Sequence, residues 1–223
     1  MKGINPMTNS KTKKLTTLGM LCAMAYTVTV IFTSAIPPIV TFPPLYFDPK
    51  DVVILLGGFL FGPLSALAIS AIVSFFEMLS VSTTGWWGLL MNIVSSCSFV
   101  IPASFIYQKR KTLTAAILGL SVGIITVVTV MTLWNYIVVP YYTGFPREAV
   151  AAMLLPVFVP FNLFKAGLNS VIALVMFKPI VTALHKSDLI EPAIIGKRST
   201  KAKWIFIIVM TYIAAVLLSY FIF

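Results

Sequence analysis

The sequence predicts an all-α membrane protein, a bundle of transmembrane helices with little soluble mass. Hydrophobic residues make up 59% of the 223 residues and charged residues only 10%, whereas soluble globular chains contain roughly 45–50% and 25%. The mean hydropathy is +1.01. At roughly 20 residues per apolar span, plus loops, this length allows about six to eight helices.

The charge distribution predicts the orientation of this bundle. Lys and Arg number 16 against 6 Asp and Glu, a net charge of +10. In a soluble protein this excess would suggest a nucleic-acid partner, but cytoplasmic loops of membrane proteins carry the same excess. If the N-terminus is cytoplasmic, 13 of the 16 basic residues are cytoplasmic, with Lys50 and Arg147 outside and Lys165 within a span. We therefore expect a multi-pass membrane protein with a cytoplasmic N-terminus and no nucleic-acid partner.

The first third of the chain combines one span with an unusual loop. Residues 1–14 form a basic cytoplasmic N-terminus, and Leu15–Ile36 is the first span, because its apolar run is too long for a signal peptide. The next stretch contains Pro37-Pro38 and Pro43-Pro44, which cannot continue a helix. Since it is almost wholly apolar, we expect it to pack against or into the bundle.

A short second helix is predicted from Asp48-Pro49-Lys50-Asp51 to about Gly62-Pro63. Asp48 can cap the helix, Pro49 suits its first position, and Asp51 favours its positive end. About twelve residues span roughly 18 Å, less than a bilayer core of roughly 30 Å. The helix is therefore either tilted and buried with its loop, or merged with the next segment.

Four longer spans follow. A loop over Pro140–Pro156, with a short helix around Glu148–Leu155, is expected before the last of them. Residues 187–203 are a basic cytoplasmic linker, and Trp204–Phe223 is apolar enough for an additional transmembrane helix. The four spans are Leu64–Ser80, Gly88–Tyr107, Leu113–Val139 and Phe161–Leu184.

Motifs for enzymatic chemistry are missing from the sequence. It contains no G-x-x-x-x-G-K-[ST] phosphate loop, no H-E-x-x-H and no G-x-S-x-G, and its one histidine is His185. Cys22 and Cys97 lie in apolar runs and form neither a disulfide framework nor a metal site. We therefore expect no enzyme, no metal and no cofactor.

Polar residues inside the spans predict a binding pocket. Five of them come from four segments and lie within roughly 10 Å of the outer surface, at about 1.5 Å per residue: Glu77, Asn92, Asn135, Asn162 and Lys165. Asn169 shares a helix face with the last two. Such residues usually face a cavity or a partner. The alternative is hydrogen bonding between helices, including an ion pair of Lys165 with Glu77.

Small residues at four-residue spacing form a second pattern. Gly19 and Ala23 lie on the first span, and Ala66, Ser70 and Ser74 lie on the third. This spacing lets helices approach closely. It indicates either packing within the chain or docking onto another membrane subunit.

Together these segments resemble the substrate-binding (S) subunits of bacterial energy-coupling-factor (ECF) vitamin transporters, and among them the riboflavin-specific ones. The resemblance covers about residues 12 to 186. It is carried by Phe47-Asp48-Pro49-Lys50-Asp51, the G-x-x-x-G-P-L motif of Gly58 to Leu64, and Pro160 to Lys165. It implies a six-helix transmembrane bundle over residues 15–186, in a bacterial cell membrane, with the first loop closing over the ligand. The run at Trp204–Phe223 is an extra helix relative to this family.

The resemblance also implies site residues and partners. Ligand contacts carry over onto Asn135, Asn162 and Lys165, with Leu45, Tyr46, Phe47 and Asp48 nearby. Gly19 and Ala23 correspond to the face that meets a transmembrane coupling subunit, which works with two ATPase subunits. The transported ligand would be riboflavin, with FMN left open. Another vitamin such as pantothenate or folate, a self-sufficient secondary transporter and a membrane enzyme are the alternatives.

Overall fold

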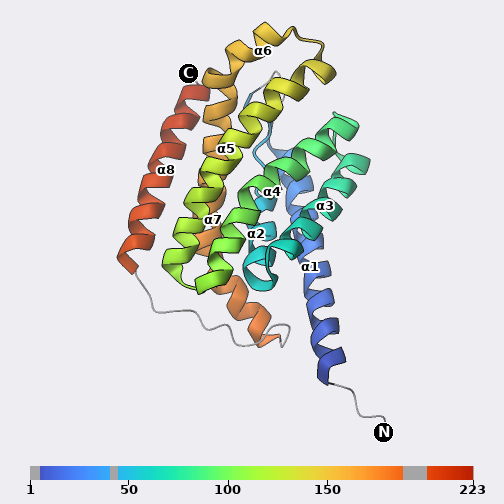
Figure 1. The fold of residues 1–223 in the computed structure, drawn as a ribbon, viewed down its shortest axis with the longest axis vertical. Coiled ribbons are helices and arrows are strands. Elements are labelled where there is room, and N and C mark those ends of the chain that lie inside the picture. The colour runs from blue at the N-terminus through green and yellow to red at the C-terminus, as the bar shows by residue number, and fades with distance from the viewer. Residues whose placement is uncertain (1–5, 41–44, 188–199, 223) are drawn as a thin grey trace.

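The computed structural model describes residues 6–40, 45–187 and 200–222, which are almost entirely helical (Figure 1). In chain order the elements are α1 (Pro6–Ala35), α2 (Lys50–Phe61), α3 (Pro63–Ser80), α4 (Gly85–Arg110), α5 (Leu113–Thr143), α6 (Arg147–Met153), the π-helical turn η1 (Leu154–Phe158), α7 (Val159–Lys186) and α8 (Thr200–Ile222). Every span predicted from the sequence corresponds to one of these helices.

The helices α1 to α5 and α7 form a six-helix bundle (Figure 1). Within the described residues, five segments are long and apolar enough to cross a membrane: Lys11–Ala35, Pro63–Ser80, Gly85–Arg110, Leu113–Thr143 and Arg147–Ala183. The start of α1, the α4–α5 connection and the end of α7 lie at one end of the bundle, and α6 lies at the other (Figure 1). The chain is a multi-pass membrane protein, as the composition predicts.

Helix α2 is buried inside this bundle. It has 12 residues, and the ten from Lys50 to Phe59 are all buried. It does not merge with α3, because Gly62 adopts a φ of 93° between them, a conformation that favours glycine. Pro63 then begins α3, where its missing N–H costs nothing. Of the two alternatives that the sequence leaves open, the structure therefore shows the short, buried helix and not the merged one.

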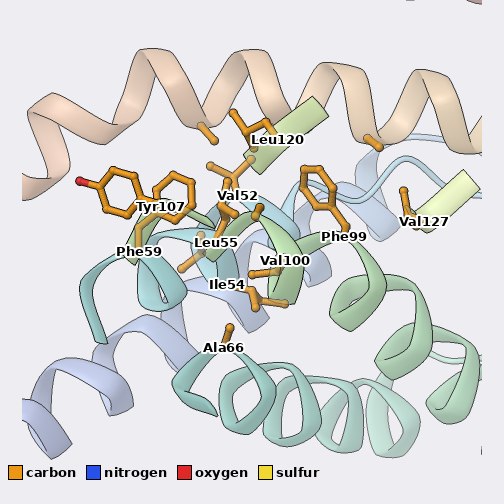
Figure 2. Close-up of a cluster of buried hydrophobic side chains, with 14 of the residues drawn as sticks. Val52, Ile54, Leu55, Phe59, Ala66, Phe99, Val100, Tyr107, Leu120 and Val127 are labelled. Carbon is orange, nitrogen blue, oxygen red and sulfur yellow. The ribbon is translucent and has the colours of Figure 1, made fainter. Parts of the chain in front are cut away.

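The backbones of α4 and α5 approach each other closely. A Cβ atom added at Gly119 would lie 2.6 Å from the carbonyl oxygen of Ala103, and one at Gly123 would lie 2.5 Å from that of Phe99. Only glycine permits this approach, which is typical of small-xxx-small contacts in membranes. Figure 2 shows the result, a core in which Val52 and Leu55 of α2 lie between side chains of α4 and α5.

The end of the bundle near the α4–α5 connection is closed by aromatic side chains. The Phe59 and Tyr107 rings stack with centroids 4.3 Å apart, and Phe177 meets both edge-on at 5.8 Å. Next to them, the Gln108 amide donates to the carbonyl oxygen of Phe59 at 2.7 Å. This bond satisfies a carbonyl at the end of α2 that has no helical partner.

The prediction of a long loop over Pro140–Pro156 is wrong. Helix α5 continues past Pro140 to Thr143, and Gly144, with a φ of 74°, ends it. The predicted short helix is present as α6, and it continues through η1 into α7. Val139, Val150 and Phe158 form a buried cluster against which Leu45 packs. The cover over this end of the bundle is therefore helical.

The C-terminal apolar run is a helix, as expected. Helix α8 packs along α7, with Phe206 buried and Met210 packed against the core. Its outer face exposes large apolar side chains such as Ile208 and Tyr212. This pattern suits a helix with one face on the bundle and the other in lipid. The domain boundaries given above, including the linker 187–203, stay predictions, and residues 188–199 lie outside the described residues.

Candidate ligand-binding cavity

A cavity lies between α1, α3, α4, α5 and α7 and the loop that precedes α2. Eight of the ten ligand-site residues predicted from the sequence line it: Leu45, Tyr46, Asp48, Glu77, Asn92, Asn135, Asn162 and Lys165. Its apolar walls include Met91, Met131, Tyr142 and Phe161. The structure thus brings together polar side chains from distant segments, as their shared depth predicts. Their contact with a ligand stays a prediction.

The main difference between the sequence-based prediction and the structure concerns Lys50. The sequence predicts that Lys50 lies outside the membrane, but this residue is buried in the bundle and only 1% exposed. Its ammonium lies 2.7 Å from Oδ2 of Asp48 and 2.6 Å from Oε2 of Glu77. Glu77 is therefore paired with Lys50, and the alternative of an ion pair between Lys165 and Glu77 is not what the structure shows. Burial of this ammonium is sustained only because two carboxylates pair with it.

Asp48 connects the loop to three helices. Its Oδ1 accepts hydrogen bonds from the hydroxyl of Thr29 at 3.1 Å and from the backbone N–H of Lys50 at 3.0 Å. The second bond satisfies the N–H of Lys50 at the start of α2, although Pro49 and not Asp48 occupies the N-cap position. Burial would raise the pKa of the Asp48 carboxyl, but the neighbouring Lys50 and Lys165 hold it below its ordinary value. Asp48 is therefore a fixed anion at the edge of the cavity.

Lys165 has a looser environment than Lys50. Its ammonium lies 3.8 Å from Oδ2 of Asp51, beyond hydrogen-bonding distance, and its side chain is 12% exposed in the cavity wall. Asp51 is held by other donors, the hydroxyl of Ser96 at 2.5 Å and the amide of Asn169 at 3.5 Å. Lys165 therefore keeps donors that a ligand in the cavity could use.

The two asparagines of the cavity differ in how far the protein occupies them. The Asn162 amide donates to the carbonyl oxygen of Phe158 at 2.7 Å. Asn135 is 2% exposed, and its Oδ1 has no hydrogen-bond partner among the described residues. Buried polar atoms are nearly always paired. The Oδ1 atom of Asn135 is therefore an acceptor that a ligand in the cavity could use.

Two predicted site residues do not line the cavity. The ring of Phe47 packs edge-on against Phe32 at 6.1 Å and Phe164 at 5.8 Å, behind the loop. The amide of Asn169 donates to the backbone oxygen of Asp48 at 3.1 Å. Both residues hold the loop in place, so they would act on a ligand only through Leu45, Tyr46 and Asp48.

The two small-residue patterns have different surroundings. Ala66, Ser70 and Ser74 are buried in the bundle, so they serve packing within the chain. Gly19 and Ala23 are exposed on α1, and a Cβ atom at Gly19 would meet nothing within 4 Å. The α1 pattern therefore remains available to another membrane subunit.

Comparison with known proteins assigns the fold. The sequence model of the family described as "ECF transporter, substrate-specific component" matches residues 13–177. The chain belongs to this family. A solved S component of a bacterial ECF transporter matches this S component with a TM-score of 0.65 and 26% identity, over 78% of this chain and 98% of the other. The family is a transporter component and not an enzyme family, as the missing catalytic motifs predict.

Two curated proteins are similar to this S component along most of their length. The riboflavin transporter RibU of Staphylococcus aureus is 28% identical over 193 residues, 83% of this chain and 100% of the relative. The riboflavin transporter FmnP of Bacillus subtilis is 23% identical over 176 residues, 75% of this chain and 91% of the relative.

Sequence reasoning missed Lys50 because it stands next to two aspartates at a helix start, a pattern typical of an exposed cap. A signal for its burial was nevertheless present. Every residue that follows Asp51 in α2 is apolar or glycine, and a short helix that is apolar all round is buried along its whole length. A lysine at the first position of such a helix is therefore buried with it.

Proposed function

We propose that this S component is the riboflavin-binding subunit of an ECF uptake transporter in a bacterial cell membrane. Two relatives that match it over nine-tenths or more of their own length are riboflavin transporters. The subunit captures the vitamin from outside and delivers it through a coupling module. FMN, which carries the same ring system, is the related ligand to be compared.

The main structural support for this proposal is a cavity with apolar walls that also contains polar groups without hydrogen-bond partners among the described residues. Lys165 offers donors that no described residue uses, and Asn135 and Asn162 lie in the same wall. The isoalloxazine ring has carbonyl and ring-nitrogen acceptors at one end, which suit the ammonium of Lys165. Its dimethylbenzene end suits the apolar walls. Ligand pockets commonly combine apolar walls with a few placed polar groups.

The positions of the basic residues support a cytoplasmic N-terminus. Lys109, Arg110 and Lys111 end α4, and Lys178 and Lys186 lie near the end of α7. These helix ends lie at the end of the bundle where α1 begins (Figure 1). With Lys50 buried, Arg147 remains as the described basic residue exposed at the opposite end. By the positive-inside rule the cavity then opens to the outside.

ATP-driven transport requires partners. The chain has no phosphate loop, so it binds the vitamin alone and needs a transmembrane coupling subunit and two ATPase subunits to accumulate it. The exposed Gly19 and Ala23 of α1 are the proposed docking face. Helix α8, with 23 residues, is long enough to add a span that ends outside.

Purification decides the ligand. The detergent-solubilised protein should carry a flavin that absorbs visible light. In a titration, binding to the protein should quench the fluorescence of riboflavin. Pantothenate and folate carry carboxylates that Lys165 could pair with, so both are tested as competitors. A colourless protein that binds one of them and not riboflavin would overturn the assignment. ATP-independent accumulation by the pure protein in liposomes would instead favour a secondary transporter.

A further inference from the structure

Glu77 is a buried carboxylate, and only one of its two oxygens has hydrogen-bond partners among the described residues. Its Oε2 accepts hydrogen bonds from the ammonium of Lys50 at 2.6 Å and from the amide of Asn92 at 2.7 Å. Its Oε1 is buried and has no hydrogen-bond partner among the described residues. A buried acceptor, and above all a charged one, is costly to leave without a donor. Since Glu77 and Asn92 both line the cavity, a ligand there could supply that donor.

Lys50 has shorter contacts with carboxylates than Lys165 has, and it is more deeply buried. It is 1% exposed and lies outside the cavity wall. It bridges Asp48 on the loop and Glu77 on α3. A charge-assisted bond to one carboxylate oxygen fixes the orientation of the other. The lysine therefore determines how Glu77 presents its second oxygen.

We propose that Lys50 is a positioning residue, which holds Glu77 by Oε2 so that Oε1 accepts a hydrogen bond from an N–H or O–H group of the bound ligand. This inference rests on the proposed function, since riboflavin provides such donors in its ring imide and its ribityl hydroxyls. It assigns the cavity two polar regions, donors around Lys165 and an acceptor at Glu77. A ligand with acceptors alone would satisfy only one of them.

The test combines two variants with two analogues. 3-Methylriboflavin lacks the imide N–H and lumiflavin lacks the ribityl hydroxyls, so together they identify which donor meets Glu77. In Glu77→Gln, Lys50 and Asn92 both donate and would select the amide oxygen, which turns the amide N–H₂ toward the donor of the ligand. Riboflavin affinity should fall about ten- to a hundredfold. For the analogue that lacks the relevant donor, the affinity should differ less than about threefold between the parent and Glu77→Gln, because this analogue does not form the bond with Glu77 in either protein.

Lys50→Met should reproduce this selective loss without touching the ligand. The double variant Lys50→Met/Glu77→Gln should bind riboflavin about as Glu77→Gln does, because Lys50 acts through Glu77. It also keeps the summed charge of the Asp48, Lys50 and Glu77 group unchanged, so it remains informative where Lys50→Met alone fails to fold. Lys178→Met, at an exposed position near the end of α7, is the matched control and should bind all three flavins as the parent does.

Thermal unfolding of each variant separates folding from binding. The proposal is overturned if folded Glu77→Gln loses riboflavin and both analogues by the same factor, or if the single losses multiply in the double variant. Either result would give Lys50 and Glu77 a structural role only. Failure of the parent to bind riboflavin at all would instead overturn the proposed function, so the two failures are distinguishable.

Discussion

The ammonium of Lys165 lies 3.8 Å from Oδ2 of Asp51, close enough to feel its charge and too far to donate a hydrogen bond to it. Lys50, by contrast, forms two short ion pairs. Lys50 and Lys165 therefore have different roles. The ammonium of Lys50 is paired with two carboxylates of the protein, whereas the ammonium of Lys165 keeps hydrogen-bond donors that a ligand in the cavity could use.

Replacing Lys165 should weaken ligand binding more than any other single truncation in the cavity wall. A charge-assisted hydrogen bond contributes about 1.5–3 kcal/mol, so Lys165→Ala should raise the Kd for riboflavin about ten- to a hundredfold. Titration calorimetry on the detergent-purified protein measures this. Lys178→Ala is the control, since Lys178 is exposed. A folded Lys165→Ala protein that binds as tightly as the parent would show that the site lies elsewhere.

The neutral amides should matter less. Asn135→Ala and Asn162→Ala should each cost up to about tenfold in riboflavin affinity, since a neutral hydrogen bond contributes about 0.5–1.5 kcal/mol. Thr129→Ala, at an exposed position on α5, should have no effect on the same fluorescence titration. Equal affinities for all four proteins would argue against a polar contact at this wall.

The exposed glycine on α1 should affect assembly and not binding. Gly19→Leu adds a branched side chain to a face where no described residue lies within 4 Å of a Cβ, so the isolated subunit should fold and bind riboflavin normally. Co-purification with the coupling subunit and the ATPases should fall several-fold, because close helix approach needs a small residue. Val122→Leu, on the exposed part of α5, is the control. An unchanged yield of complex would remove Gly19 from the docking face.

Gly123 should be essential for stability. A Cβ at this position would lie 2.5 Å from the backbone oxygen of Phe99, and a backbone atom cannot rotate away. Gly123→Val should therefore separate α4 from α5 and destabilise the protein by about 1–3 kcal/mol. Thermal unfolding in detergent would register this as a lower Tm, while Thr129→Val, at an exposed position, should leave the Tm unchanged. A Tm equal to that of the parent would mean that the two helices can part without cost.

Orientation is tested by cysteine labelling in a background where Cys22 and Cys97 are serine. Cysteine at Glu148, exposed on α6, should react with an impermeant reagent in intact cells. Cysteine at Lys109, near the end of α4, should react only after the membrane is permeabilised, because the positive-inside rule places that end in the cytoplasm. The reverse pattern would invert the bundle and point the cavity inward.

The helices and the cavity were predictable for the same reason. Apolar runs of about twenty residues identify the spans, and a polar side chain within one is too costly to face lipid. Asn135 and Lys165 therefore indicate a cavity before any contact is known. The tight α4–α5 contact was not predicted, since glycines within an apolar run look alike whether they face lipid or, like Gly119, a neighbouring backbone.

Ion pairing could not be derived from depth alone. Lys50 and Lys165 are both within reach of several carboxylates, and only the backbone path decides which pairs form. Burial of α2 brings Lys50 to Glu77, 27 residues away along the chain. The loop before α6 was mispredicted for a related reason. Proline breaks a helix in water, but a membrane helix such as α5 can continue through Pro140 because its neighbours compensate the lost bond.

The burial of α2 also bears on how the protein enters the bilayer. A helix of 12 residues that begins with Lys50 and Asp51 is too short and too polar at one end to be inserted on its own. Its charges are tolerated only when Asp48, Glu77 and Ser96 are in place around them. Insertion of α1, α3 and α4 must therefore come before, or together with, the settling of α2 between them. Biogenesis of this half of the molecule is therefore cooperative, because α1, α3 and α4 together form the environment in which α2 is buried.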